Sequence, residues 1–126
     1  GKLGRAGEAL AAFGAAAAQE ATERAREFSW QDLSGIVSAM MHVDLAKVSQ
    51  VRDLALALVG RAATCCGEIG TQALLNIALS AVRLRVERGA LRPMAWGIAE
   101  AFGARGALNE IDLRQWLEIQ RYCGLP

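Results

Sequence analysis

Apolar residues recur at helical spacing along most of the chain. One stripe at i, i+3, i+4, i+7 and i+8 consists of Leu33, Ile36, Val37, Met40 and Met41. The same stripe returns 41 residues later as Leu74, Ile77, Ala78, Ala81 and Val82. Such spacing places the apolar side chains on one face of an amphipathic helix. Because β-branched residues do not alternate with polar ones as in a half-buried strand, we expect an all-α fold.

The pattern predicts six helices. Five of them cover residues 5–27, 30–43, 71–88, 93–103 and 110–122, and a sixth, the third along the chain, ends near Cys66 after a cap at Asp44 or Ser49. Leu10, Phe13 and Ala17 mark the apolar face of the first helix, whose alanines permit close helix packing, although so Ala-rich a segment also fits a frayed arm. Gly89 is expected to end the fourth helix, and Pro93 to take the favoured first position of the fifth.

The segment Phe28-Ser29-Trp30-Gln31-Asp32-Leu33 has the features of a helix start. Ser29 is suited to accept the backbone N–H of Asp32, and the Asp32 carboxylate lies at the positive end of the helix dipole. Phe28 and Leu33 occupy the two positions of a hydrophobic staple. Weaker copies of this segment occur at residues 69–74, with Gly70 as the cap, and at residues 108–113, with Asn109 as the cap.

These helix starts, near residues 28, 69 and 108, divide the chain at intervals of about 40 residues. A period of this size is typical of an α-solenoid, in which antiparallel helix pairs bury their faces against neighbouring pairs. We therefore predict a single domain over residues 1–126, with about three repeats stacked as a short α-solenoid, and we expect the chain to continue past Pro126. The alternative is an irregular bundle with three ordinary helix starts. The last helix carries Leu113, Trp116 and Leu117 with no following partner, so this stripe should be exposed.

The net charge limits the kinds of partner. Fourteen basic and 13 acidic residues leave +1, whereas a protein that holds nucleic acid mainly by neutralising phosphates is usually more basic. The charge is uneven, however. Residues 69–108 have a local balance of +3, from five basic residues, Arg83, Arg85, Arg88, Arg92 and Arg105, against two acidic ones, Glu87 and Glu100.

The remaining residue types argue against an enzyme. The chain has one histidine, His42, which cannot form a metal site or a catalytic triad alone, and it has no glycine-rich phosphate loop. Three cysteines, two of them adjacent, make a poor disulfide framework and favour a reducing compartment. No apolar run approaches the roughly 20 residues of a membrane span. We expect no cofactor, no metal site and no small-molecule substrate.

The helix start at Phe28–Leu33, followed by Ile36, Val37 and Ala39, resembles the aromatic–Ser–x–x–Asp–Leu motif of organellar α-solenoid repeats. This group includes the octotricopeptide and heptatricopeptide repeats and the arrays of FAST-kinase-like and RAP-domain proteins. The resemblance covers residues 28–122. The chain departs from the pattern at Gly70, and it lacks the asparagine- and tryptophan-rich consensus of many members. The resemblance implies action on RNA in mitochondria or chloroplasts.

The resemblance also implies that partners lie along the first helix of each pair, where repeat proteins present side chains to single bases. The equivalent positions here, two residues beyond the staple leucine, are Gly35, Asn76 and Gln115. Asn76 and Gln115 are candidates for hydrogen bonds to a base. The alternative reading is that both are polar residues on a solvated face.

The best candidates for phosphate contacts are Arg83, Arg85, Arg88 and Arg92. The alternative is that these arginines only complement the dipole of the fourth helix. We therefore expect a non-enzymatic scaffold of an organellar ribonucleoprotein, most plausibly the mitochondrial ribosome, that contacts ribosomal RNA and neighbouring proteins in the mitochondrial matrix. Another organelle or the cytoplasm stays open, and so does a protein–protein adaptor or accessory subunit of another large complex without RNA contact.

Overall fold

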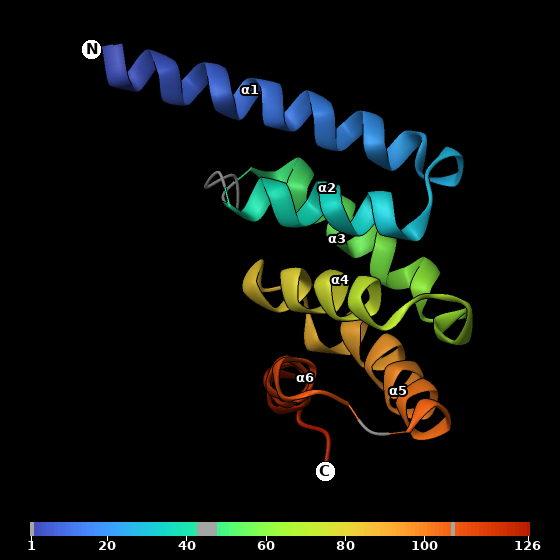
Figure 1. The fold of residues 1–126 in the computed structure, drawn as a ribbon. Coiled ribbons are helices and arrows are strands. Elements are labelled where there is room, and N and C mark those ends of the chain that lie inside the picture. The colour runs from blue at the N-terminus through green and yellow to red at the C-terminus, as the bar shows by residue number, and fades with distance from the viewer. Residues whose placement is uncertain (1, 43–47, 107) are drawn as a thin grey trace.

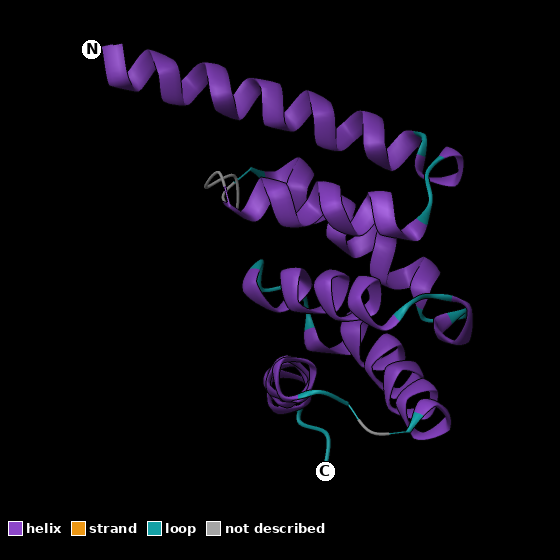
Figure 2. Ribbon diagram, viewed as in Figure 1, coloured by secondary structure: helices purple, strands orange, loops and turns teal. Residues whose placement is uncertain are grey.

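The computed structural model describes residues 2–42, 48–106 and 108–126, with the backbone alone at residues 2–6. In this part of the chain every regular element is helical, as predicted (Figure 2). The α-helices are α1 (Lys2–Glu23), α2 (Trp30–His42), α3 (Ser49–Ala62), α4 (Thr71–Arg83), α5 (Arg88–Arg105) and α6 (Glu110–Cys123). Two short 3₁₀ helices, η1 (Ala25–Glu27) and η2 (Cys66–Glu68), precede α2 and α4.

The six helices form two rows. In the first row α2 contacts α4 and α4 contacts α6, and in the second row α1 contacts α3 and α3 contacts α5. Figure 1 shows α1 to α5 running back and forth across the view, whereas α6 is seen along its axis. The third helix of the first row therefore crosses α4 steeply. None of the described helices combines the length and apolar character that a membrane crossing needs.

The connections that lead into α2 and α4 have the same local structure. Each consists of a 3₁₀ turn, an extended residue and a cap residue. Phe28 is extended at φ −108° and ψ 148°, and Ile69 at φ −102° and ψ 137°. The carbonyls of Ser29 and Gly70 then accept the first helical N–H at 3.0 Å, in both cases from the leucine four residues later. Two segments 41 residues apart thus repeat in hydrogen bonding as well as in sequence.

The caps predicted from the sequence are confirmed. Ser29 Oγ accepts the backbone N–H of Asp32 at 3.0 Å, and Asn109 Oδ1 accepts that of Asp112 at 2.7 Å. Gly70 occupies the cap position of α4 without a side-chain bond. The remaining proposed cap is wrong, because Ser49 is the first residue of α3 and Val48 occupies the cap position. The alternative cap Asp44, and the predicted helix end at Val43, lie outside the described residues.

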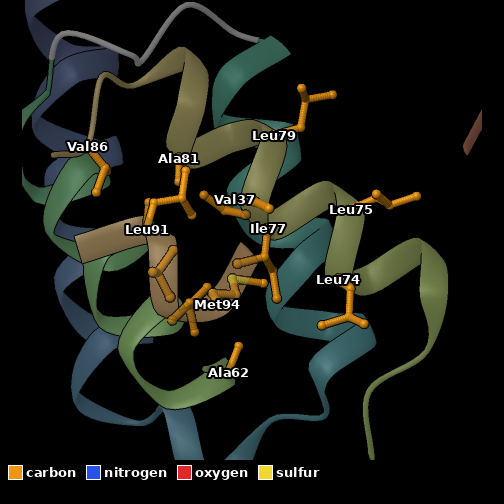
Figure 3. Packing of buried hydrophobic residues seen from close by; sticks show 14 of the residues in the cluster. Val37, Ala62, Leu74, Leu75, Ile77, Leu79, Ala81, Val86, Leu91 and Met94 are labelled. Atoms are coloured by element: carbon orange, nitrogen blue, oxygen red, sulfur yellow. The ribbon is translucent and has the colours of Figure 1, made fainter. Parts of the chain in front are cut away.

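The core lies between the two rows. Figure 3 shows Val37 of α2, Ile77 of α4 and Met94 of α5 pointing toward one another, and all three are at most 1% exposed. In the second row the buried positions of α3 recur in α5 forty residues later. Val51, Leu54, Ala55, Leu58 and Ala62 correspond to Leu91, Met94, Ala95, Ile98 and Phe102. Each of the four helices α2 to α5, called the inner helices below, thus buries one apolar stripe. Burial of apolar surface is the main favourable contribution to the free energy of folding.

The predicted apolar face of α1 is wrong at Leu10 and Phe13, whereas Ala17 packs partly buried against the core. Leu10 is 43% and Phe13 is 72% exposed, and the buried side of α1 consists instead of the small residues Gly14, Ala18 and Ala21. These residues allow the close contact between α1 and α3, which large side chains would prevent. The predicted helix also ends earlier, because α1 stops at Glu23 and residues 25–27 form η1.

The boundary between the fourth and fifth helices also differs from prediction. α4 ends at Arg83 and not at residue 88, because Arg85 adopts a left-handed conformation with φ 58°. The N–H of Val86 then donates to Ala81 O at 3.0 Å, which is the bond pattern of a Schellman motif. This reversal buries Leu84 and Val86 on either side of the turn. Apolar burial therefore ends α4, and no glycine is needed.

α5 starts five residues before the predicted Pro93. The carbonyl of Glu87 accepts the N–H groups of Ala90 and Leu91 at 3.0 and 3.1 Å, so Gly89 lies in the first turn and does not end α4. Leu91 gains full burial from this earlier start. Pro93 is thus the sixth residue of α5 and lies inside the helix, not at the predicted first position, so the carbonyl of Gly89 lacks the N–H that another residue at position 93 would donate. α3 likewise ends at Ala62, and Cys66 opens η2.

Arg105 joins α5 to the connection before α4. Its Nη1 donates to Thr71 Oγ1 at 3.0 Å, and its Nη2 donates to the carbonyl oxygens of Cys66 at 3.2 Å and Ile69 at 2.5 Å. One guanidinium therefore binds carbonyl groups of the η2 connection together with the first residue of α4. This contact fixes the end of α5 against the start of α4.

α6 exposes two of the three residues in the stripe that the sequence predicts to lack a partner, whereas the third, Trp116, packs against the core with its ring centroid 5.8 Å from that of Phe102. Leu113 and Leu117 are each 46% exposed, and Ile111 is 66% exposed. Leu113 occupies the repeat position of Leu33 and Leu74, but it lacks their complete burial. The buried side of α6 instead carries Ile119 and Cys123. In the part of the chain that the structure describes, no helix covers the Leu113 face.

Leu33→Ala should lower the free energy of unfolding by about 2–5 kcal/mol, because it leaves a cavity at a fully buried site. Leu113→Ala, the same change at the equivalent and half-exposed position, should cost less than about 1 kcal/mol. Urea unfolding of both variants measures the difference. Equal losses would mean that the Leu113 face is covered in solution.

Ser29→Ala should cost about 1 kcal/mol, because the N–H of Asp32 loses its acceptor at the start of α2. Ser29→Asp is the matched control, since aspartate also caps and should keep most of the stability. Thermal unfolding compares the two variants. A Tm unchanged in Ser29→Ala would rule out a stabilising cap at this position.

Candidate nucleic-acid interface

The first row carries a groove that spans its three helices. This α2–α4–α6 groove has a volume of about 380 Å³. It is lined by Ser38, Met41 and His42 of α2, by Asn76, Leu79, Ser80 and Arg83 of α4, and by Gln115 of α6. Three of the six candidate RNA-binding residues, Asn76, Arg83 and Gln115, therefore lie around one groove. The predicted surface along the first helix of each pair brings them together.

A second groove lies where α2 and α4 begin. This Trp30 groove has a volume of about 720 Å³. Its lining residues are Trp30, Gln31, Ser34, Gly35, Glu68, Ile69, Gly70, Thr71, Gln72, Ala73 and Asn76. Because Asn76 lines both grooves, the two are adjacent along α4. Polar residues thus follow the α2–α4 interface from the helix starts to the helix ends.

The residues that line the grooves recur at equivalent repeat positions. Gln31 corresponds to Gln72, Gly35 corresponds to Asn76 and Gln115, and His42 corresponds to Arg83. Positions spaced by three or four residues on a helix share one face. A single face of each first-row helix therefore supplies most of the lining of the two grooves. This face contains Gly35, Asn76 and Gln115, the positions that the sequence predicts to face a partner.

Arg83 is the arginine best placed to meet an anion. Its Nε lies 3.9 Å from Glu118 Oε2 of α6, and the two side chains are 55% and 49% exposed. A solvated ion pair of this kind contributes little free energy. The guanidinium can consequently exchange its partner for a phosphate at small cost.

The other three candidate arginines lie away from this groove. Arg85 lies at the exposed corner after α4, where its carbonyl accepts a hydrogen bond of 2.9 Å from Arg52 Nη2. Arg88 does not lie in the last turns of α4, as predicted, but at the start of α5, where its guanidinium covers the Tyr122 ring at 5.3 Å. Arg92 Nε donates to Cys123 O at 2.9 Å. The structure therefore splits the predicted cluster.

Arg88 and Arg92 hold the end of α6. Arg92 binds the carbonyl of Cys123, the last residue of α6, so it complements the dipole of α6 and not that of the fourth helix. Tyr122, under Arg88, donates its hydroxyl to Val86 O at 2.6 Å. These contacts agree with a structural reading of Arg88 and Arg92 and make them weaker candidates for RNA contact.

The sequence prediction omits most of the residues that line the grooves, among them Trp30, Ser38 and His42. The available signal was the 41-residue interval, because it aligns His42 with Arg83 and Ser38 with the groove residue Leu79. The same interval, applied to the whole helix face and not only to the residues after the staple, indicates that His42 and Ser38 also lie on the groove face.

The cysteines form neither a disulfide nor part of a metal-binding cluster within the described residues. All three are free, and no group of three or more His, Cys, Asp or Glu side chains in the described part of the chain is arranged to hold a metal ion. Cys66 packs against Gly97, where an added Cβ would lie 2.7 Å from Cys66 Sγ, so α5 needs glycine there to approach η2. Burial raises the pKa of the Cys66 thiol, and burial also raises that of Cys123.

Comparison with protein-family models, curated proteins and solved structures finds no match to this chain. The geometry of the two grooves, together with the repeated sequence pattern, therefore carries the functional argument.

The raised pKa of Cys66 predicts a loss of stability in alkali. In the unfolded chain the thiol ionises near its ordinary value of 9.0, while the folded protein keeps it protonated. The stability difference between the wild type and Cys66→Ser should be constant below about pH 8 and should shrink as the pH rises past 9.0. Urea unfolding at several pH values measures this difference. A constant difference up to pH 10.5 would mean that the thiol titrates alike in both states.

Proposed function

We propose that this chain is a non-enzymatic scaffold, a short α-solenoid of about three repeats that binds RNA along the first row of helices. In this proposal it belongs to an organellar ribonucleoprotein, most plausibly the mitochondrial ribosome, and it contacts ribosomal RNA and neighbouring proteins in the mitochondrial matrix. The organelle and the ribosome come from the motif resemblance at Phe28–Leu33. The surface comes from the groove geometry.

One observation carries the RNA-binding surface. Gly35, Asn76 and Gln115 occupy the same repeat position, and each of them lines one or both grooves of the first row. A helical-repeat protein that reads single bases presents equivalent side chains from successive repeats in this way. The amide groups of Asn76 and Gln115 both donate and accept hydrogen bonds, as recognition of a base edge requires.

The charge distribution supports a modest electrostatic contribution. Arg83 lies beside these amides, and its ion pair with Glu118 is solvated. His42, at the equivalent position on α2, lines the same groove. A net charge of +1 favours binding through a few local contacts over broad neutralisation of phosphates.

A protein–protein adaptor is the second candidate, and α6 provides the observation in its favour. Leu113 and Leu117, which are four residues apart and share one face, expose apolar side chains on the last helix of the first row. Exposed apolar groups that lie close together often mark a protein contact. An adaptor and an RNA-binding scaffold differ in which surface is essential, namely the α6 face or the grooves.

Arg83→Gln should weaken binding of single-stranded RNA and reduce its dependence on salt. Loss of one phosphate contact makes the negative slope of log K against log salt concentration shallower by about 0.7 for a single strand. Arg26→Gln is the matched control, because it removes the same charge from the exposed surface of η1, outside both grooves. Fluorescence anisotropy between about 50 and 200 mM salt measures the slopes.

The outcome separates the two candidates. RNA binding that weakens in Arg83→Gln but not in Arg26→Gln supports the groove as the interface. Absence of RNA binding by the wild type would remove the RNA proposal and leave the adaptor. Equal weakening in the two variants would mean that the chain attracts RNA only through its overall charge.

A further inference from the structure

Trp30 lies at the edge of its groove and is restrained there by its neighbours. It is the first residue of α2 and is half-buried against the core. The guanidinium of Arg61, from the last turn of α3, covers the indole with its central carbon 4.9 Å from the ring centroid. A cation over an aromatic ring is attracted by the π electrons and limits the motion of the ring. The indole is therefore an ordered surface before any ligand arrives.

The space beside Trp30 is open and bordered by amide groups. Gly35, one turn along α2, has no side chain, and no atom comes within 4 Å of the position that its Cβ would occupy. Gln31, Gln72 and Asn76 also line the groove. Its volume of about 720 Å³ lies in the range of sites for small organic molecules. The groove thus combines an aromatic surface, free space and donors and acceptors for a planar polar group.

The charges around the groove favour a base over a phosphate. Glu68 is an acidic side chain in the lining and would repel an anion. Arg83 lies instead in the adjoining α2–α4–α6 groove, which shares Asn76 with the Trp30 groove. A nucleotide with its base beside Trp30 can direct its backbone away from Glu68 and toward Arg83. Aromatic side chains bind unpaired bases in this manner in many single-strand-binding proteins.

We propose that the Trp30 groove binds one unpaired nucleobase of a single-stranded RNA, stacked on the indole of Trp30 with its edge toward Gln72 and Asn76. This inference rests on the proposed RNA-binding function and adds the form of the ligand. A base within a duplex is already stacked and paired, so a duplex of the same sequence binds weakly.

Two substitutions at Trp30 separate stacking from packing. Trp30→Leu keeps an apolar side chain but removes the aromatic face, and Trp30→Phe keeps a ring. Stacking of a base on an aromatic side chain contributes about 1–3 kcal/mol, so Trp30→Leu should weaken single-strand binding by roughly 5–150-fold. Trp30→Phe should retain most of the affinity. Trp96→Leu is the matched control, because Trp96 is 55% exposed on α5 and lines neither groove.

Anisotropy with a labelled single strand of about 12 nucleotides, and with the same strand in a duplex, measures the affinities. Tryptophan fluorescence provides a second measurement that does not depend on how well Trp30→Leu folds. Because the chain has a third tryptophan, Trp116, both proteins in this measurement also carry Trp116→Phe. The single strand should quench the emission of Trp96→Phe/Trp116→Phe, which retains only Trp30, and should leave that of Trp30→Phe/Trp116→Phe unquenched.

The possible results decide the proposal. If the wild type binds no RNA, both the proposed function and this inference are wrong. If the wild type binds RNA in a manner that depends on Arg83, but Trp30→Leu binds as tightly as Trp30→Phe, only the inference is wrong. Equal affinity for duplex and single strand would also overturn it, as would quenching of Trp30→Phe/Trp116→Phe equal to that of Trp96→Phe/Trp116→Phe.

Discussion

Burial of one apolar stripe per inner helix between two rows is the constraint on which the rest of the structure depends. Leu33 and Val37 on α2, and Leu74 on α4, face inward and are fully buried. Because a helix has one orientation that buries its stripe, the positions on the opposite side are fixed at the same time. Asn76 and the other groove residues owe their alignment to this requirement. The proposed binding surface is the outer side of these packed helices.

The sequence contains enough information to predict the all-α class, the starts of α2, α4 and α6, and the buried stripes, since periodicity and capping are local properties. It does not predict the end of α4, because burial of Leu84 and Val86 decides that boundary and a tertiary contact does not appear in a local pattern. The prediction that Leu10 and Phe13 of α1 face the core is wrong for the same reason, because a tertiary contact decides which side of α1 is buried. Large apolar residues normally mark a core, but the close contact with α3 selects Ala18 and its small neighbours.

The sequence predicts the candidate site residues that recur at the 41-residue interval. It does not predict those whose position depends on contacts between helices. Alignment from the staple leucine placed Asn76 and Gln115 on the groove face, and the same interval reaches His42. The four arginines looked like one cluster because they are close in sequence. Folding separates them, because the turn at Arg85 directs Arg88 and Arg92 toward the end of α6. Nearness along a chain is a poor guide to nearness in space across a helix boundary.

The left-handed conformation of Arg85 also has a thermodynamic meaning. An L-residue with a side chain pays roughly 1–2 kcal/mol for this backbone conformation, and glycine would avoid that cost. The turn after α4 is therefore less stable with Arg85 than it would be with glycine. The arginine side chain is exposed at the corner between the two rows. Arg85 is thus a position where the backbone favours one residue type and the chain carries another.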